Sequence, residues 1–319
     1  ALAAEGLAGL DCTVTTGTNF IQAMNAGVDV VLTSSPHRSA KMMETLAAFA
    51  AAQVPVVLDL EDDYEEMPVN HPDYAASGLG NPAHARAYMA ALMLASRIVV
   101  PSAFFSEALQ AANYRVDVVR DAWSAKSGVW NKPSAERGLV NIGWIDEGGG
   151  LEDLALMRRV LVRVLRQFPE TQIVLAGNMQ AVALFDSIPL SRRIYLPSTQ
   201  AEDLPYLLGQ IDILVVPQRN MAYNRSRSSA LLMKAGIKRI PWLAMPLPEY
   251  QEWKAGGICT ASTDEWFTYL SHLITDPEIR RTLGEDGYRK AASREIQKCA
   301  DEWRTVIEKT LAEPGKLAE

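Results

Sequence analysis

The sequence predicts an α/β protein made of two Rossmann-like, doubly wound domains that face a central cleft. Short apolar runs rich in β-branched residues alternate with longer amphipathic stretches, the pattern of βα units in a parallel sheet buried on both faces. This alternation starts afresh after residue 137. The 319 residues also match two domains of roughly 150 residues better than one. The central cleft is expected between the carboxyl edges of the two sheets.

In the first half, each expected strand is a short apolar run, such as VPVVL at 54–58 or RIVVP at 97–101. The strands are predicted at 12–15, 28–33, 54–60, 97–101 and 115–120. The longer amphipathic stretches between them predict helices at 19–26, 39–52, 82–95 and 102–112. Residues 121–137 mix Trp, Ser, Gly, Asn and Pro without any period and are interpreted as a linker.

The second half repeats the alternation by the same criteria. Strands are predicted at 138–144, 172–177, 193–195, 213–217 and 240–244. Helices are predicted at 151–167, 201–210, 226–235 and from residue 264 onward, ending in a long helix at about 291–311. The pattern predicts three segments: a first domain at 1–137, a second domain at 138–290, and a C-terminal helix at 291–319 that packs back across the first domain.

Composition narrows the class of function. The 31 Lys and Arg against 38 Asp and Glu give a net charge of −7, which does not suit a nucleic-acid binder. Cys12, Cys259 and Cys299 lie far apart and form neither a disulfide framework nor a zinc motif. Since the sequence shows no apolar run long enough to span a membrane and no basic signal-peptide start, a cytoplasmic protein is expected, with peripheral membrane contact left open. The initial Ala indicates a processed or trimmed chain.

The first concentrated functional signal lies between the strand at 138–144 and the helix at 151–167. Glycines there, including Gly143, Gly149 and Gly150, permit close backbone approach, and a helix N-terminus offers free N–H groups to a diphosphate. The spacing is neither GxGxxG nor a Walker motif, so a flexible loop is an equal alternative. Trp144 is either a core residue or a ring that stacks on a base or sugar.

The second signal is the polar segment after the strand at 213–217. Three arginines with amide and hydroxyl groups at the carboxyl end of a strand suit an anionic, hydrogen-bonding ligand. The alternative is a solvated loop whose serines cap the next helix. The residues concerned are Arg219, Asn224, Arg225, Ser226, Arg227, Ser228 and Ser229.

Two loops of the first half are expected to face the same cleft. His37, and Asp62 or Asp63, are candidates for a general base or for holding an acceptor hydroxyl. A surface or helix-capping role is the alternative for His37. For the acidic run at 59–63, which contains Asp59 and Glu61 as well as Asp62 and Asp63, a solvated turn is favoured over a Mg²⁺ site.

These residues resemble the GT-B glycosyltransferases of family 4, the "glycosyl transferases group 1" type. The resemblance covers most of the chain and is stronger in its second half, with further matches in the acidic run and at Val99 to Ser102. It is carried by Gly143-Trp144 followed by Asp153-Leu154, by Phe168-Pro169 with Leu175-Ala176-Gly177, by Arg227-Ser228-Ser229 through Pro241, and by Glu265-Trp266 with Asp276-Pro277.

The chain departs from the family pattern at several functional positions. The glutamate that holds the donor ribose is replaced by Lys234, and both ends of the E-x7-E pattern are absent. Leu231 stands in place of a lysine, and Arg227 replaces the lysine of the Lys-Ser pair. The histidine of the first turn is missing near Gly150. A short Ala/Gly-rich stretch, Ala1 to Leu10, stands where the family has an apolar strand and a Gly-rich loop, so part of the acceptor domain is expected to be reduced or its first strand to lie outside this sequence. Donor recognition is therefore atypical or lost.

The resemblance implies a metal-independent glycosyltransferase that uses a nucleotide-diphosphate sugar as substrate and no cofactor. The first domain would bind a saccharide, lipid-linked or protein acceptor, and the second the donor. Catalytic roles would fall to Arg227, His37, Asp62 and Asp63. Donor contacts would come from Gly143, Trp144, Gly149, Gly150, Asn178, Arg219, Asn224, Arg225, Ser226, Ser228, Ser229 and Lys234.

Other functions stay open at this stage. The missing glutamates leave the stereochemistry undecided, and they allow a degenerate GT-B protein that binds or regulates another glycosyltransferase. A nucleotide-sugar epimerase of related fold has weaker support, because its His and Glu clusters are not visible. A dinucleotide-dependent oxidoreductase has weaker support still, because no GxGxxG follows any predicted strand.

Overall fold

The structure is a computed structural model that describes residues 2–10, 12–17, 19–76, 78–131, 138–146, 150–197 and 203–313. Its contacts divide the chain into two compact units. Unit 1 comprises Ala1–Ser124, Arg225–Ser228 and Ile296–Glu319. Unit 2 comprises Ala125–Asn224 and Ser229–Glu295. Each unit is a parallel α/β body, as the sequence predicts.

The sheet of unit 1 has four parallel strands in the order β1-β2-β3-β4. The strands are β1 (Val31–Ser34), β2 (Val56–Asp59), β3 (Arg97–Val100) and β4 (Val116–Val118). Both central strands are mostly apolar and mostly buried, with one charged residue each, Asp59 and Arg97, as expected for parallel strands covered on two faces. Strand order follows chain order, so the described part of this sheet contains no reversal.

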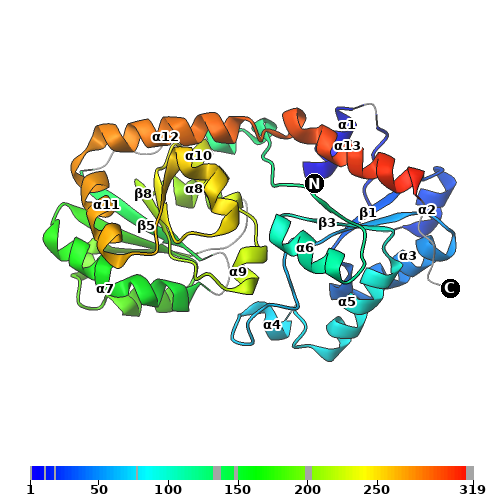
Figure 1. Ribbon diagram of the computed structural model, residues 1–319, viewed down its shortest axis with the longest axis horizontal. Helices are drawn as coiled ribbons and strands as arrows, with labels where there is room; N and C mark the ends of the chain where they lie inside the picture. The colour runs from blue at the N-terminus through cyan, green and yellow to red at the C-terminus, as the bar shows by residue number, and fades with distance from the viewer. Residues whose placement is uncertain are drawn as a thin grey trace. The chain divides into compact units, whose positions relative to one another are not determined.

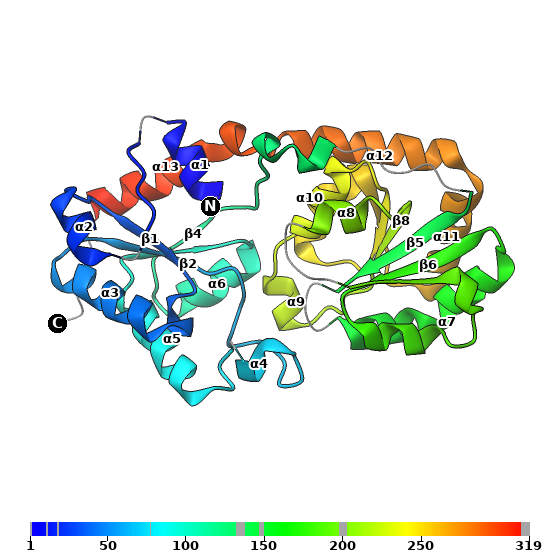
Figure 2. The same cartoon turned by 180° about the vertical axis from the view of Figure 1, so that it is seen from behind.

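Helices cover both faces of the unit 1 sheet (Figure 2). Val57 and Val99 belong to a core cluster with Trp303 and Val306, which places α1 and α13 over one face. The other face carries α3, α5 and α6. The helices of this unit are α1 (Leu2–Ala8), α2 (Phe20–Asn25), α3 (Ala40–Ala51), the short α4 (Asp73–Ala76), α5 (Pro82–Leu94), α6 (Ala103–Ala111) and α13 (Ile296–Ala312).

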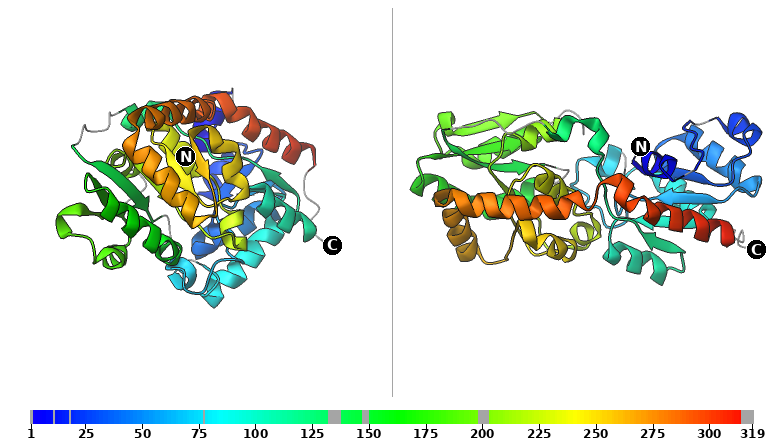
Figure 3. Two further views of the ribbon diagram at one scale, coloured as in Figure 1. Left: turned by 60° about the vertical axis from the view of Figure 1, so that its left-hand side comes forward. Right: turned by 90° about the horizontal axis from the view of Figure 1, so that it is seen from above.

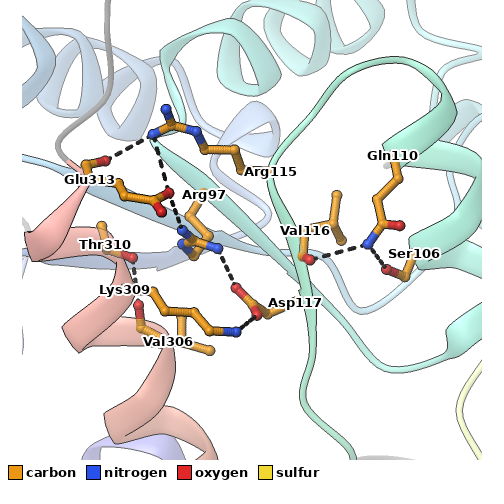
Figure 4. A network of polar contacts seen from close by, with 10 residues as sticks. All are labelled: Arg97, Ser106, Gln110, Arg115, Val116, Asp117, Val306, Lys309, Thr310 and Glu313. Carbon is orange, nitrogen blue, oxygen red and sulfur yellow. Dashed lines mark hydrogen bonds and ion pairs between the residues drawn. The ribbon is translucent and has the colours of Figure 1, made fainter.

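Helix α13 is joined to unit 1 through apolar and ionic contacts. It lies beside α1 (Figure 3), where an added Cβ on Gly6 would meet Ala300 Cβ at 3.0 Å. At its C-terminal end, Asp117 of β4 accepts from both Arg97 Nη1 and Lys309 Nζ at 2.6 Å (Figure 4). Glu313 accepts from Arg97 Nη2 at 3.2 Å. These contacts tie the end of the helix to the edge strand β4 and to its neighbour β3.

The sheet of unit 2 has six parallel strands in the order β10-β9-β8-β5-β6-β7. The chain runs outward from β5 to β7, returns to β8 on the other side of β5, and continues outward to β10. This is the doubly wound Rossmann order. The strands are β5 (Val140–Ile145), β6 (Thr171–Ala176), β7 (Arg193–Leu196), β8 (Ile213–Val216), β9 (Trp242–Ala244) and β10 (Gly257–Cys259).

The helices of unit 2 lie on both faces of this sheet (Figure 1). Alternate residues of β5, β6 and β8, such as Ile142, Ile173 and Ile213, pack with α7 and α11 in one core cluster. The opposite face carries α8 and α10. The helices are α7 (Leu151–Gln167), α8 (Leu204–Leu208), α9 (Ala222–Ser226), α10 (Ala230–Ile237), α11 (Thr263–Thr275) and α12 (Pro277–Ala292).

Two predicted elements differ from the structure. Residues 12–17 form no strand, because residues 13–17 are exposed and pair with no strand of the described chain. The helix predicted at 226–235 is present, but its predicted start is wrong: α9 ends at Ser226 and α10 begins at Ala230. Ser226 is fully buried and belongs to unit 1, where its hydroxyl donates to Asp63, whereas α10 belongs to unit 2.

No helix among the described residues is long and apolar enough to cross a membrane.

Candidate functional site

The point at which the strand order of unit 2 reverses lies between β5 and β8. In sheets of this order, ligands bind outside the carboxyl ends of the strands at such a point. Here the turn from β5 into α7 ends at Gly150, and the segment after β8 begins at Pro217. The two polar segments singled out in the sequence therefore leave adjacent strands at the same edge of one sheet.

Side-chain contacts join the two segments. Arg219 Nε forms a close ion pair with Asp153 Oδ1, and Arg219 Nη2 lies 3.1 Å from Glu152 Oε2. Asn224 Nδ2 donates to Asp153 Oδ2 at 3.1 Å and to the Arg219 carbonyl at 2.9 Å. The Asp153 carboxylate thus holds Arg219 and Asn224 at the first turn of α7. The hydrogen bond from Arg219 to Asp153 raises the pKa of the guanidinium, which stays charged.

Exposure differs sharply within this group. Asp153 and Asn224 are buried, at 4% and 6% exposed, whereas the side chains of Arg219 and Glu152 are 41% and 56% exposed. The buried pair therefore fixes one edge of the guanidinium, and its other edge reaches solvent beside an exposed carboxylate. A ligand anion that takes the place of Glu152 would find a cation already oriented.

Two of the predicted donor residues lie in strand β5, where packing accounts for them. An added Cβ on Gly143 would lie 2.2 Å from Ile211 Cγ1, so glycine is required there for close packing. Trp144 is 3% exposed and belongs to the core of unit 2, with no open ring face for a ligand. Gly150 donates its N–H to Asp146 Oδ1 at 3.2 Å and precedes α7 without any side-chain cap. Gly149 lies outside the described residues.

Three other predicted donor residues have different placements within unit 2. Asn178 follows β6, and its side chain accepts from the Gln180 N–H at 2.9 Å. Ser229 precedes α10, and its hydroxyl accepts from Trp253 Nε1 at 2.7 Å. Lys234 is half-buried on α10.

The rest of the arginine and serine segment, Arg225–Ser228, belongs to unit 1. Ser226 Oγ donates to Asp63 Oδ2 at 2.7 Å, and the Ser226 carbonyl accepts from Ser102 Oγ at 2.7 Å. Arg227 Nε lies 3.9 Å from Asp62 Oδ1. Arg225 stacks over the Phe104 ring at 4.0 Å, and Ser228 is half-buried. The predicted catalytic residues Arg227, Asp62 and Asp63 therefore do come together.

His37 lies in an aromatic cluster that includes Tyr64, the residue after Asp63. It is 2% exposed, and its ring lies 4.6 Å from Tyr64 and 5.5 Å from Tyr88 between ring centroids. The tyrosines enclose the imidazole, which leaves an acceptor almost no surface of His37 to contact.

Burial changes the acidity of two carboxyls of unit 1. It raises the pKa of Asp63, although the Ser226 hydrogen bond opposes the change. At the end of β2, burial and the charges of Glu61 and Asp121 raise the pKa of Asp59 to about 7. In the sequence, Asp59 stood out only as part of an acidic run. The sequence signal that could have identified Asp59 as a partly buried acid was its position between two apolar residues, Leu58 and Leu60, which are both buried.

Compared by sequence alone, the chain matches no family model and no curated protein. Compared by structure, it is similar to several solved glycosyltransferases. Sucrose-phosphate synthase from Thermosynechococcus elongatus is 14% identical with a TM-score of 0.60, over 92% of this chain and 77% of that one. HepE from Anabaena, solved with UDP and glucose, is 14% identical with a TM-score of 0.61, over 91% and 81%.

TarM is 10% identical with a TM-score of 0.63, and the match covers 90% of this chain but only 57% of TarM. These neighbours are GT-B proteins with two Rossmann-like domains. At such low identities the likeness concerns the fold, and the chain has the GT-B fold that the sequence predicts.

Proposed function

We propose that this GT-B chain is a glycosyltransferase that takes a sugar from a nucleotide-diphosphate donor held at the switch point of unit 2. The observation that carries the proposal is the link from Asn224 through Asp153 to Arg219, which fixes a half-exposed guanidinium beside the first turn of α7. The solved neighbours support the choice of donor, since HepE binds UDP and glucose on the same fold.

The chemistry requires positive charge where the donor breaks. When the bond from the sugar to the diphosphate cleaves, negative charge gathers on the leaving phosphate oxygens. In the proposal, Arg219 exchanges Glu152 for these oxygens while Asp153 keeps its Nε in place. Amide groups of the α7 N-terminus add hydrogen bonds and the positive end of the helix dipole. Asp153 and Asn224 are positioning residues, because they act through Arg219.

For the acceptor, the proposal assigns the acidic group of unit 1. Asp62 is 31% exposed in its side chain, whereas Asp63 is buried with Ser226. A partly exposed carboxylate can accept a hydrogen bond from a sugar hydroxyl and so orient it. Arg227 stays beside Asp62 as its counter-ion. Lys234, Asn178 and Ser229 remain proposed donor-side residues for substitution. Ser228 is not included because it belongs to unit 1, and Trp144 and His37 are not included because they are buried.

The test is donor cleavage by the full chain. UDP-glucose, GDP-mannose and ADP-glucose are incubated with the protein and a panel of saccharide, lipid-linked and protein acceptors, and released nucleoside diphosphate is measured. Arg219→Gln is expected to abolish release. Arg281→Gln is the matched control, since Arg281 is an exposed arginine of α12 that pairs with the equally exposed Glu278, three positions earlier on the same helix. Release unaffected by Arg219→Gln would overturn the proposed site.

The same experiment addresses the non-enzymatic alternative. A ligand that binds only the folded chain raises its melting temperature. Thermal stabilisation by a nucleoside diphosphate without any donor cleavage would favour a degenerate GT-B protein that binds donors or partners. Absence of both effects with every nucleotide would contradict the glycosyltransferase proposal.

A further inference from the structure

Beyond the donor site, the outward face of α7 carries a concentration of positive charge. Residues 154–169 contain four arginines and no acidic residue, in a chain whose net charge is −7. The four arginines line one surface hollow of about 640 Å³, together with Val162 and Ser187. They are Arg158, Arg159, Arg163 and Arg166.

The helix itself gains little from this arrangement. Arg159 and Arg163 are four positions apart, and Arg163 and Arg166 are three apart, so like charges occupy neighbouring positions on the helix surface and destabilise it. The negative end of the helix dipole accounts for Arg166 in the last turn. It does not account for Arg159 and Arg163, which lie further back along the helix.

Two of the arginines are already oriented. Arg163 stacks over the Phe267 ring with its guanidinium carbon 3.8 Å from the centroid. Arg158 donates from Nε to the Leu184 carbonyl and lies 3.5 Å from the exposed carboxylate of Asp186. Arg159 and Arg166 are exposed, and neither forms an ion pair with any part of the chain that the structure describes. Their charges are available to a ligand.

We infer that this hollow binds a ligand with closely spaced phosphate groups, at a site separate from the donor site. Guanidinium groups bind phosphate oxygens through paired hydrogen bonds, and an anion among them removes the repulsion between like charges. The volume is that of a small-ligand pocket. Arg159 follows Leu151, the first residue of α7, by about 12 Å along the helix axis, so the hollow and the first turn are distinct places on one helix.

The first probe is tripolyphosphate, titrated calorimetrically into the full chain at low ionic strength. The wild type is expected to bind, and Arg159→Gln with Arg166→Gln is expected to weaken binding about ten-fold or more. Arg281→Gln with Arg289→Gln is the matched control, because it removes the same charge from exposed, ion-paired positions of α12. Equal weakening by both double variants, or none by the first, would overturn the inference.

A second arm identifies the source of the phosphate. Vesicles of phosphatidylglycerol are compared with vesicles of phosphatidylcholine in co-sedimentation. If the wild type sediments with the anionic vesicles and the Arg159 and Arg166 double variant does not, the site binds lipid headgroups. If the wild type binds tripolyphosphate but does not sediment with the vesicles, the site binds soluble compounds. Binding of neither probe by the wild type would contradict the inference. Nucleoside diphosphate binding by this variant is expected to equal that of the wild type, which keeps this test separate from that of the donor site.

Discussion

The hydroxyl of Ser226 donates a 2.7 Å hydrogen bond to the buried carboxylate of Asp63, which lies 163 positions earlier in the chain. The contact brings a residue of the arginine and serine segment into unit 1. It also satisfies an acidic group that burial would otherwise leave at a high free-energy cost. Ser226 therefore has a structural role in unit 1, whatever ligand the neighbouring arginines take.

Ser226→Ala is expected to lower the free energy of unfolding by about 1–3 kcal/mol, because the Asp63 carboxylate would lose a buried donor. The loss should be larger at about pH 8 than at about pH 4, since the hydrogen bond favours the ionised form and lowers the pKa of Asp63 against the effect of burial. Urea unfolding of the wild type and the variant at the two pH values measures this loss of stability. Ser293→Ala, at an exposed serine after α12, is the control and should change little; an equal loss in both variants would contradict this role.

The raised pKa of Asp59 predicts that the free energy of unfolding changes with pH in the opposite direction to that expected for a salt-bridged acid. Its pKa is raised to about 7 in the folded chain, so the folded state binds more protons than the unfolded state between about pH 4 and pH 7. Stability should therefore fall as the pH rises through this range, by an amount on the order of a few kcal/mol. Asp59→Asn should flatten the curve. A slope that the substitution leaves unchanged would show that other groups cause it.

Gly143→Ala should destabilise unit 2 by about 1–3 kcal/mol through overpacking against Ile211. Gly138→Ala is the control, because nothing lies within 4 Å of an added Cβ at Gly138. Combining Gly143→Ala with Ile211→Ala should cost less than the sum of the two single changes. Strict additivity in denaturant unfolding would rule out the proposed contact as the reason for glycine.

Asp117→Asn should destabilise unit 1 by about 3 kcal/mol at neutral pH, because it leaves the buried Arg97 without its main partner. Lys309→Met should cost less than about 1 kcal/mol, since Lys309 is half-exposed. Burial raises the pKa of Asp117, but hydrogen bonds from Lys309 and Arg97 outweigh burial and lower it overall. The stability that unit 1 gains from the ionised Asp117 is therefore present above about pH 4 and is lost as the pH falls further. Equal effects of the two substitutions would contradict the ranking.

Local patterns were sufficient where local contacts decide the structure. Helix α7 has the predicted bounds of 151–167, because a glycine turn and a clear apolar face mark it in the sequence. The predicted start of the helix at 226–235 was wrong for the opposite reason, because α10 begins at Ala230. Ser226 bonds to Ser102 and Asp63, far away in the chain, and nothing in the local pattern shows those partners.

The candidate site was predictable as a set of residue types, but the partners of its charges were not. The three arginines of one segment suggested a single anion-binding loop. In the structure Arg219 pairs with Asp153 and Glu152 in unit 2, and Arg227 approaches Asp62 in unit 1. These carboxylates are brought near by the tertiary fold, so spacing along the sequence carries no information about them.

The central claim is that a nucleotide-diphosphate donor binds beside Arg219 at the switch point of unit 2. Hydrogen exchange of the full chain, with and without the nucleoside diphosphate that most raises its melting temperature, tests this most directly. We predict slower exchange in 150–156 and 217–224, lost in Arg219→Gln and kept in Arg281→Gln. Protection confined to other segments, or unchanged protection in Arg219→Gln, would contradict the account.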